Sequence, residues 1–587
     1  MMDNRDTVDA PLDGEASPTG VTEAILATAV RALTEASQTL TAAATQMMQT
    51  VQGIPDGTFA EDIAQFPAGG LLPAASSIPQ INSWEDDPFS EAIPTANPSS
   101  PDPVVVDVST TTAPLLRVTI LDPQPLPARY PPGTPDFRYW VAAEALSRGI
   151  NFWTPLLPTG TRWSAATSPL QVNLVVGQWL NAQYRRIDGL RFFQKTVNDV
   201  PVFSGESPDV VCHELGHAIL DALRPELWNA ASIEQAAFHE AFGDMSCILC
   251  ALQLPTYRQK ILDETQGRLN VTSRLSRAAE QLGWALRQSH PDSVDPDSLR
   301  NAANSFFYEP PEQLPTFAPF SALSSEPHSF ARVFTGAFLD VFGAMLTISG
   351  AANDANLLTV SRALGQLLID GIRTAPLTPA YFGQVAAAMI QADQARNGGQ
   401  YGNALSIAFV QRGILSPNSI TALANAPVPH FEPAPGAPAD DAAAVTGHGG
   451  VSDIGGTQML ITYDGGADNQ SYRHGFEDAP DLPTRSIPDE FGLGAQLLVH
   501  VPTDQDAFAV APAAPGIGSV EKIPPEQAAR HFVEGLVRQG RVDLGSTTSV
   551  AATNLSSIED ATHELEDAPG GKVLRRLYFD CGLCRSL

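Results

Sequence analysis

A short stretch near the middle of the chain carries two histidines and a glutamate at a spacing that suits metal chemistry. The stretch runs from Asp209 to Asp221 and contains the pattern His-Glu-x-x-His, in which His213 and His217 stand four residues apart. On an α-helix, residues four apart lie one above the other, so both imidazoles can reach the same metal ion. Glu214 would point slightly to one side of that line, where it can accept a proton from water. The pattern therefore predicts a helix that carries a zinc site and a neighbouring general base.

A second stretch offers the third protein ligand that a catalytic zinc ion needs. This stretch, Phe238-His-Glu-Ala-Phe-Gly-Asp244, places Glu240 and Asp244 about one helical turn apart. One carboxylate can bind the ion while the other accepts a hydrogen bond from a zinc-bound imidazole and so fixes its tautomer. His239 is an alternative ligand, but it lies about 100° around the helix from Glu240. We therefore expect His239 to lie in the core or behind a ligand.

Together, the two stretches resemble the thermolysin-like zinc peptidases, which are also called gluzincins. That family carries His-Glu-x-x-His on one helix and, on the next helix, a glutamate that is followed four residues later by an aspartate. The resemblance covers roughly residues 170–348. It implies that the zinc ligands are His213, His217 and Glu240, that the general base is Glu214, and that the supporting acids are Asp244 and Asp221.

The resemblance also implies contacts with a peptide substrate on either side of the metal. Asn181-Ala182 matches the edge strand on which the family binds a peptide backbone as an added β-strand. His328 opens a helix, as does the family histidine that stabilises the oxyanion, although helix capping or packing is an almost equal alternative for it. Trp228 stands where the family has a tyrosine, and its indole N–H can donate a hydrogen bond but cannot act as a phenol. Arg332 is a further candidate for stabilising the oxyanion.

The other cysteine and acidic motifs are weaker signals. Cys247 and Cys250 are expected to pack inside the second metal helix, with a redox pair as the alternative. The pair Cys581-Gly-Leu-Cys584 could bind a metal or form a disulfide. The acidic stretch at 464–468 could bind calcium, but it lacks the spacing of an EF-hand, which favours a solvated loop.

The segments around these motifs predict an α+β fold in which a β-containing lobe precedes a mainly helical lobe, with the metal site between them. From residue 208 to about 412 the apolar residues recur with helical spacing. Ahead of that segment, short β-rich runs alternate with one helix, and a hairpin turns at Asp188-Gly189. The expected strands are 104–108, 115–121 and 170–176, and the expected helices are 135–148, 209–223, 233–252, 272–287, 330–348 and 355–372.

The composition along the chain divides it into five expected regions. The first has an amphipathic helix at 21–51, which could pack on the body of the protein or dock a partner. A propeptide is a further possibility for this region. The regions are an N-terminal extension with a Pro-rich linker (1–103), a β-containing lobe (104–207), a helical lobe with the zinc site (208–420), a linker (421–450) and an accessory α+β region (451–587).

The charge of the chain excludes several classes of partner. A net charge of −31 would repel the phosphates of nucleic acid and the head groups of anionic membranes. We find no run of about 18 apolar residues, so no integral membrane segment is expected. No standard secretory signal is recognisable, and five cysteines are too few for a disulfide framework. We therefore expect a cytoplasmic location or export by a route that is independent of a signal peptide.

These features favour a zinc metallopeptidase, a hydrolase that would use Zn²⁺ and water to cleave a peptide or protein substrate internally. Two alternatives belong to other classes of function. One is a catalytically inactive zinc-binding assembly protein, in which the N-terminal helix or the C-terminal region would bind a partner. The other is an exported peptidase effector or toxin with a narrow target.

Overall fold

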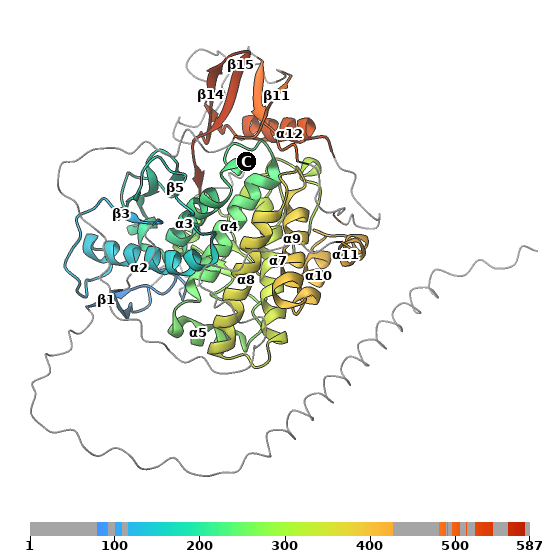
Figure 1. Ribbon diagram of the computed structural model, residues 1–587. Coiled ribbons are helices and arrows are strands. Elements are labelled where there is room, and N and C mark those ends of the chain that lie inside the picture. The colour runs from blue at the N-terminus through green and yellow to red at the C-terminus, as the bar shows by residue number, and fades with distance from the viewer. Residues whose placement is uncertain are drawn as a thin grey trace, which may run out of the picture. The chain divides into compact units, whose positions relative to one another are not determined.

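The computed structural model describes most of the chain from residue 79 onward. The amphipathic helix expected at 21–51 and the acidic stretch at 464–468 lie outside the described residues, as do Cys584 and nearly all of the linker expected at 421–450. Within the described part, the chain has the mixed α and β content that the sequence predicts (Figure 1). The described residues are 79–91, 100–108, 115–426, 481–488, 490, 496–504, 512, 523–543 and 561–581.

A five-stranded sheet contains the expected hairpin. β5 (Ala182–Arg185) and β6 (Gly189–Phe192) run antiparallel on either side of the turn. Gly189 has a φ of +82°, and a Cβ atom there would lie 2.1 Å from the carbonyl oxygen of Gln171, so this turn requires glycine. The strand order is β16-β5-β6-β4-β3, which places β5 beside a strand from the far end of the chain. The other three strands are β3 (Val118–Ile120), β4 (Leu170–Asn173) and β16 (Phe579–Asp580).

The helical part is built around α3, α4 and α7. α3 packs on α4, α4 packs on α7, and α7 packs on α8 (Figure 1). Among the described residues, α7 is the one helix with the length and composition of a membrane span, but 78% of its apolar window is buried in the fold, as in a core helix. The helices are α2 (Pro135–Trp153), α3 (Pro208–Leu223), α4 (Ile233–Ala251), α5 (Pro255–Thr265), α6 (Glu280–Arg287), α7 (Pro327–Ile348), α8 (Asp354–Thr374), α9 (Tyr381–Asn397), α10 (Gly402–Gln411) and α11 (Pro417–Ala424).

The helix expected at 272–287 is wrong in its first half. The chain instead forms β9 (Arg277–Ala278), which pairs with β10 (Arg300–Asn301), and α6 begins only at Glu280. Ala279, between the two elements, has a φ of +54°, which a continuous right-handed helix does not allow. The strand pairing joins segments that are distant in the sequence, so local periodicity could not indicate it.

Part of the expected Pro-rich linker is also ordered. β1 (Gln80–Ser83) pairs with β2 (Val104–Asp107). The turn that follows β1 buries Trp84 and Phe89, and Trp84 meets Phe137 of α2 edge to face. The burial of two large aromatic rings stabilises a segment whose overall composition is typical of a linker. A second short hairpin joins β7 (Gln194–Val197) to β8 (Val200–Phe203).

The accessory region contains a second five-stranded sheet, with the order β11-β12-β15-β14-β13. It belongs to the same compact unit as the helices, residues 77–587. Two residues separate the end of β15 from β16, which joins the first sheet. The elements are β11 (Thr484–Ile487), β12 (Leu497–His500), α12 (Pro525–Arg538), β13 (Val542–Asp543), β14 (His563–Ala568) and β15 (Gly571–Arg576).

Candidate metal centre

Three ligand atoms that the sequence predicts converge in the interior between α3 and α4. Oε2 of Glu240 lies 3.4 Å from Nε2 of His213 and 3.6 Å from Nε2 of His217. All three side chains are buried; the Nε2 atoms of His213 and His217 have no hydrogen-bond partner, and Oε2 of Glu240 lies 3.2 Å from Nε2 of His328. Buried polar atoms without partners are costly, and a cation bound by all three would remove that cost. Two imidazole nitrogens and one carboxylate oxygen are a ligand set that zinc prefers, so these residues fit the ion.

Local sequence signals fix the position of the two helices. α3 starts with Pro208 after Ser207, whose hydroxyl accepts a hydrogen bond from the backbone N–H of Val210. Gly243 on α4 faces the first ligand, and a Cβ atom there would lie 2.5 Å from Cε1 of His213. Glycine at this position is therefore what lets α4 approach closely enough for the imidazole to fit between the helices.

Side chains behind the two imidazoles fix their orientation. Nδ1 of His213 lies 3.1 Å from Oδ1 of Asp244, as the sequence predicts for a supporting acid. Nδ1 of His217 lies 3.0 Å from Nδ1 of His239, so one ring donates a hydrogen bond to the other. Burial lowers the pKa of His217 to about 3 and that of His239 well below its usual value, so both rings are neutral. Both ligand imidazoles thus present Nε2 to the centre of the site.

Glu214 lies beside the ligands with both carboxylate oxygens lacking a hydrogen-bond partner. Its side-chain oxygen and nitrogen atoms of His213 and His217 all lie within 4.8 Å of one another. Burial raises the pKa of Glu214 well above its usual value, and the charges of Glu240 and Asp580 add to the effect. A carboxyl group in this environment has a strong tendency to accept a proton, which suits a general base.

His328, at the start of α7, faces the same centre. Its Nε2 lies 3.2 Å from Oε2 of Glu240, and its Nδ1 lies 2.6 Å from Oε1 of Glu326. Glu326 also caps α7 by accepting a hydrogen bond from the backbone N–H of Ser329. Burial alone would lower the pKa of His328, but the two carboxylates outweigh it and raise that pKa well above its usual value. His328 therefore carries a proton on the nitrogen that faces the site.

Asp221 does not lie behind a ligand imidazole, contrary to the expectation from the sequence. Its carboxylate accepts hydrogen bonds from the guanidinium of Arg186 and, at 2.8 Å, from the hydroxyl of Tyr184. Asp221 lies one helical turn beyond His217 on α3. There it is bound by Tyr184, on β5, and by Arg186, just after β5. The position behind His217 belongs to His239 instead.

Trp228 and Arg332 are also engaged elsewhere. The indole N–H of Trp228 donates to the carbonyl oxygen of Arg576 at 3.2 Å, so it is not directed at a substrate. The guanidinium of Arg332 donates to the carbonyl oxygens of Phe320 and Ala322 and holds that loop against α7. Both residues support the walls around the site, and neither is placed to stabilise an oxyanion.

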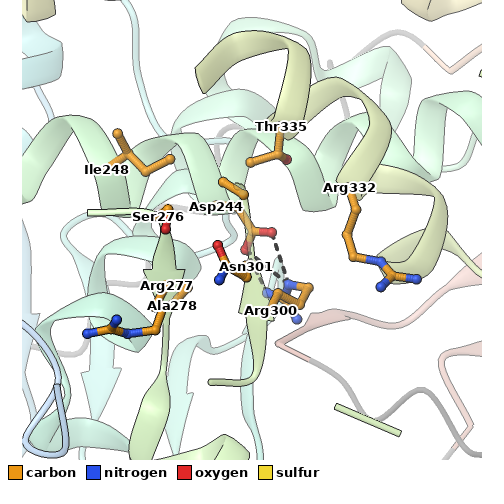
Figure 2. A pocket seen from close by; sticks show the side chains of 10 residues that line it. Asp244, Ile248, Ser276, Arg277, Ala278, Arg300, Asn301, Arg332 and Thr335 are labelled. Carbon is orange, nitrogen blue, oxygen red and sulfur yellow. Dashed lines mark hydrogen bonds and ion pairs between the residues drawn. The ribbon is translucent and has the colours of Figure 1, made fainter. Parts of the chain in front are cut away.

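Arg300, on the two-residue strand β10, is a site residue that the sequence did not indicate. Its guanidinium is buried and binds Asp244 through two N–H groups, at 2.7 and 2.9 Å (Figure 2). Another N–H group donates to the carbonyl oxygen of Cys581 at 2.7 Å. Burial alone would lower the pKa of Arg300, but Asp244 raises it above the usual value. No motif or spacing marks this arginine, because its strand is placed by pairing with the distant β9.

The edge of β5 that was expected to bind a peptide is occupied by the chain itself. The carbonyl oxygen of Ala182 accepts a hydrogen bond from the backbone N–H of Cys581 at 3.3 Å. The side-chain amide of Asn181 donates to Oδ2 of Asp580 at 2.9 Å. Ala182 therefore binds the backbone of Cys581, directly after β16, and Asn181 binds the side chain of Asp580.

The described cysteines are free thiols buried in the fold. Cys247 donates a hydrogen bond to the carbonyl oxygen of Asp209 at 3.0 Å, and Cys250 is fully buried on the same helix. Both thiols therefore pack inside the fold, as expected, and the structure shows no disulfide between them.

Comparison with known proteins gives no family by similarity. No family model matches the chain, and no curated protein matches it. The chemistry assigned to the site therefore rests on its residues and their geometry.

A second buried group of acids includes Asp209, which lies one helical turn before His213 on α3. Asp87, Asp209 and Glu280 bring carboxylate oxygens within 4.8 Å of one another, close enough to share a proton or a cation. Burial raises the pKa of Asp87 to about 6, and burial together with the neighbouring carboxylates raises those of Asp209 and Glu280 well above their usual values. Proton binding is therefore stronger in the folded chain than in the unfolded chain.

Replacement of Asp87 by asparagine should make the stability of the metal-free chain less sensitive to pH. The contribution of Asp87 is fully present below its unfolded pKa near 4 and is lost as pH rises through its folded pKa of about 6. The neutral amide avoids that loss, so at pH 7 we expect a gain of roughly 2–3 kcal/mol in the free energy of unfolding. Urea unfolding in a chelator between pH 4.5 and 7.5 measures this, with Asp102→Asn on the surface as the control. Equal pH slopes for Asp87→Asn and the wild type would contradict the interpretation.

Proposed function

We propose that this chain is a zinc-dependent endopeptidase of thermolysin-like architecture. The observation that carries the proposal is the convergence of three buried ligand atoms, from His213, His217 and Glu240, with the unpartnered carboxylate of Glu214 beside them. Two imidazoles and one carboxylate leave a fourth position open, as catalytic zinc sites do and closed structural sites do not. The arrangement of β5 and the helix pair α3 and α4 around this position supports a site between a β-containing lobe and a helical lobe.

The chain supplies the other groups that peptide hydrolysis needs. A zinc ion bound by the three ligands would lower the pKa of water and polarise the carbonyl group of a peptide. Glu214 would accept a proton from the attacking water and deliver it to the leaving amine. His328 would donate a hydrogen bond from Nε2 to the carbonyl oxygen as negative charge develops there, while Glu326 holds the ring through Nδ1.

Backbone recognition would come from β5 and Arg300. The carbonyl oxygen of Ala182 can accept a hydrogen bond from an extended peptide, and the guanidinium of Arg300 can donate one to a peptide carbonyl. Both groups already make such bonds with Cys581. These contacts are to backbone atoms, so they would bind many sequences and would position a bond within a chain. This favours a peptide or protein substrate that is cleaved internally.

A non-catalytic zinc-binding protein remains the second candidate, because β16 covers the strand edge that a substrate would need. The two functions separate in an assay with a denatured protein and zinc-loaded chain. The wild type and a Cys581→Pro chain are compared, since proline removes the N–H that binds β16 to Ala182. We expect new peptide termini that depend on zinc and disappear with chelator. Intact substrate with both chains, each with zinc bound, would favour the second candidate.

A further inference from the structure

The last described residues of the chain run along β5 as an added antiparallel strand. Phe579 lies opposite Tyr184, and Asp580 lies opposite Gln183. The backbone N–H of Cys581 extends the pairing by donating to the carbonyl oxygen of Ala182. Backbone pairing at a sheet edge is a general mode of peptide binding. These residues, 579–581, are called the tail strand below.

The tail strand is placed in register with the groups assigned to catalysis. The carbonyl oxygen of Asp580 lies 2.7 Å from Nε2 of His328, the nitrogen proposed to face the reacting carbonyl. The next carbonyl oxygen, that of Cys581, lies 2.7 Å from a guanidinium N–H of Arg300. The peptide bond between Asp580 and Cys581 thus lies between the two donors.

An aromatic anchor holds the tail strand beside the metal ligands. The ring of Phe579 stacks on His239 with centroids 3.8 Å apart and on His217 with centroids 5.0 Å apart. The side chain is 2% exposed, and the guanidinium of Arg576 lies over the ring, 4.0 Å from its centroid. Stacked rings and a cation over a ring face are favourable contacts. Phe579 therefore packs against His217, a proposed metal ligand, and against His239, which orients it.

The accessory sheet holds the start of the tail strand at the loop between α3 and α4. The backbone N–H of Arg576 donates to Oδ1 of Asn229, and its guanidinium donates to the carbonyl oxygen of Trp228 at 3.0 Å. The backbone N–H of Ala231 donates to the carbonyl oxygen of His500 on β12 at 2.8 Å. Only Leu577 and Tyr578 separate β15 from β16. So short a tether gives the tail strand a high effective concentration at β5.

We propose that the tail strand is an intramolecular inhibitor that occupies the peptide-binding edge in the register of a substrate, and that the accessory sheet delivers it. The inference rests on the proposed function, and it adds a form of regulation to the same site. Another peptide would reach β5, His328 and Arg300 only when the tail strand leaves. The backbone contacts would be satisfied by either occupant, so the two compete directly.

A matched pair of full-length variants tests the proposal without relying on catalysis. Cys581→Pro removes the N–H that donates to Ala182, whereas Cys581→Ala removes only the thiol and keeps that N–H. Both are made in a Glu214→Gln background and loaded with zinc. A fluorescent peptide with the sequence of residues 574–581 is the probe. We expect the proline chain to bind it at least 10-fold more tightly than the alanine chain and the Glu214→Gln parent, by fluorescence anisotropy.

Equal affinity for the probe in all three chains would overturn the proposal. Zinc content and thermal unfolding show whether the proline chain is folded. Phe579→Ala, which removes the aromatic anchor, is a second variant that should also bind the probe more tightly.

Hydrolysis of a quenched peptide by chains that retain Glu214 distinguishes the failure of the inhibitor proposal from the failure of the peptidase proposal. Tighter probe binding without hydrolysis in any chain shows that the tail strand occupies a peptide-binding edge and rejects the peptidase. Equal hydrolysis by the proline and alanine chains supports the peptidase and rejects the inhibitor.

Discussion

Replacement of Glu214 by glutamine should lower kcat/KM for peptide hydrolysis by about 10²- to 10⁴-fold and leave one zinc ion bound per chain. Glutamine has nearly the same shape, but its amide cannot accept the proton of the attacking water. Both oxygens of Glu214 lack hydrogen-bond partners, so the substitution breaks no existing bond. The measurement is made with zinc-loaded chains that also carry Cys581→Pro, so that the tail strand does not mask the effect.

Glu566→Gln provides the matched control, because the same chemical change falls on a side chain that is 62% exposed. Its kcat/KM should equal that of the Cys581→Pro parent. Activity of Glu214→Gln within threefold of this control would rule out Glu214 as the base and would leave the hydrolysis, if present, to another group.

Replacement of Glu240 by alanine should weaken zinc binding more than any change behind the ligands. The carboxylate of Glu240 lies within 4 Å of both proposed ligand imidazoles. Loss of a supporting residue lowers metal affinity by about 10- to 100-fold, so Asp244→Asn gives the scale for comparison. Loss of a ligand opens a second coordination position and should exceed that range. Competition with a chromophoric chelator gives both dissociation constants.

The metal-site helices were predictable because their signals are local. In α3, a serine cap, a proline at the first position and a metal-ligand pair four residues apart all lie within one stretch of sequence. α4 is buried along its whole length, so it has no polar face that would mark it as a helix. The four-residue spacing of Glu240 and Asp244 still indicates a helix, because only a helix brings both side chains to the same face. The proposed ligand set follows from these two helices once they pack together.

Features that depend on distant pairing could not be predicted in the same way. Arg300 reaches Asp244 only because β10 pairs with β9, and the segment before α6 was expected to be helical. Residues 79–91 were assigned to a linker by composition, yet Trp84 and Phe89 bury themselves against the core. Single residues in short strands leave no periodic trace in the sequence.

The environment of the two imidazoles shows where residue type misled the prediction. The resemblance to the thermolysin-like peptidases implies that Asp221 and Asp244 are both supporting acids. In the structure, Asp221 binds Arg186 instead, and His239 forms the hydrogen bond with Nδ1 of His217. A neutral histidine can fix a tautomer as an acid does, because its Nδ1 can donate or accept. The position of His239 beside Glu240 in the sequence was compatible with this role.

Titration of the metal-free full-length chain with zinc, in parallel with Glu240→Ala, tests the central claim most directly. The claim is that His213, His217 and Glu240 form one zinc site. Isothermal titration calorimetry should show one ion bound per wild-type chain and a loss of affinity in the variant beyond 100-fold. A wild-type chain that binds no zinc, or a variant that binds it as tightly as the wild type, would contradict the account.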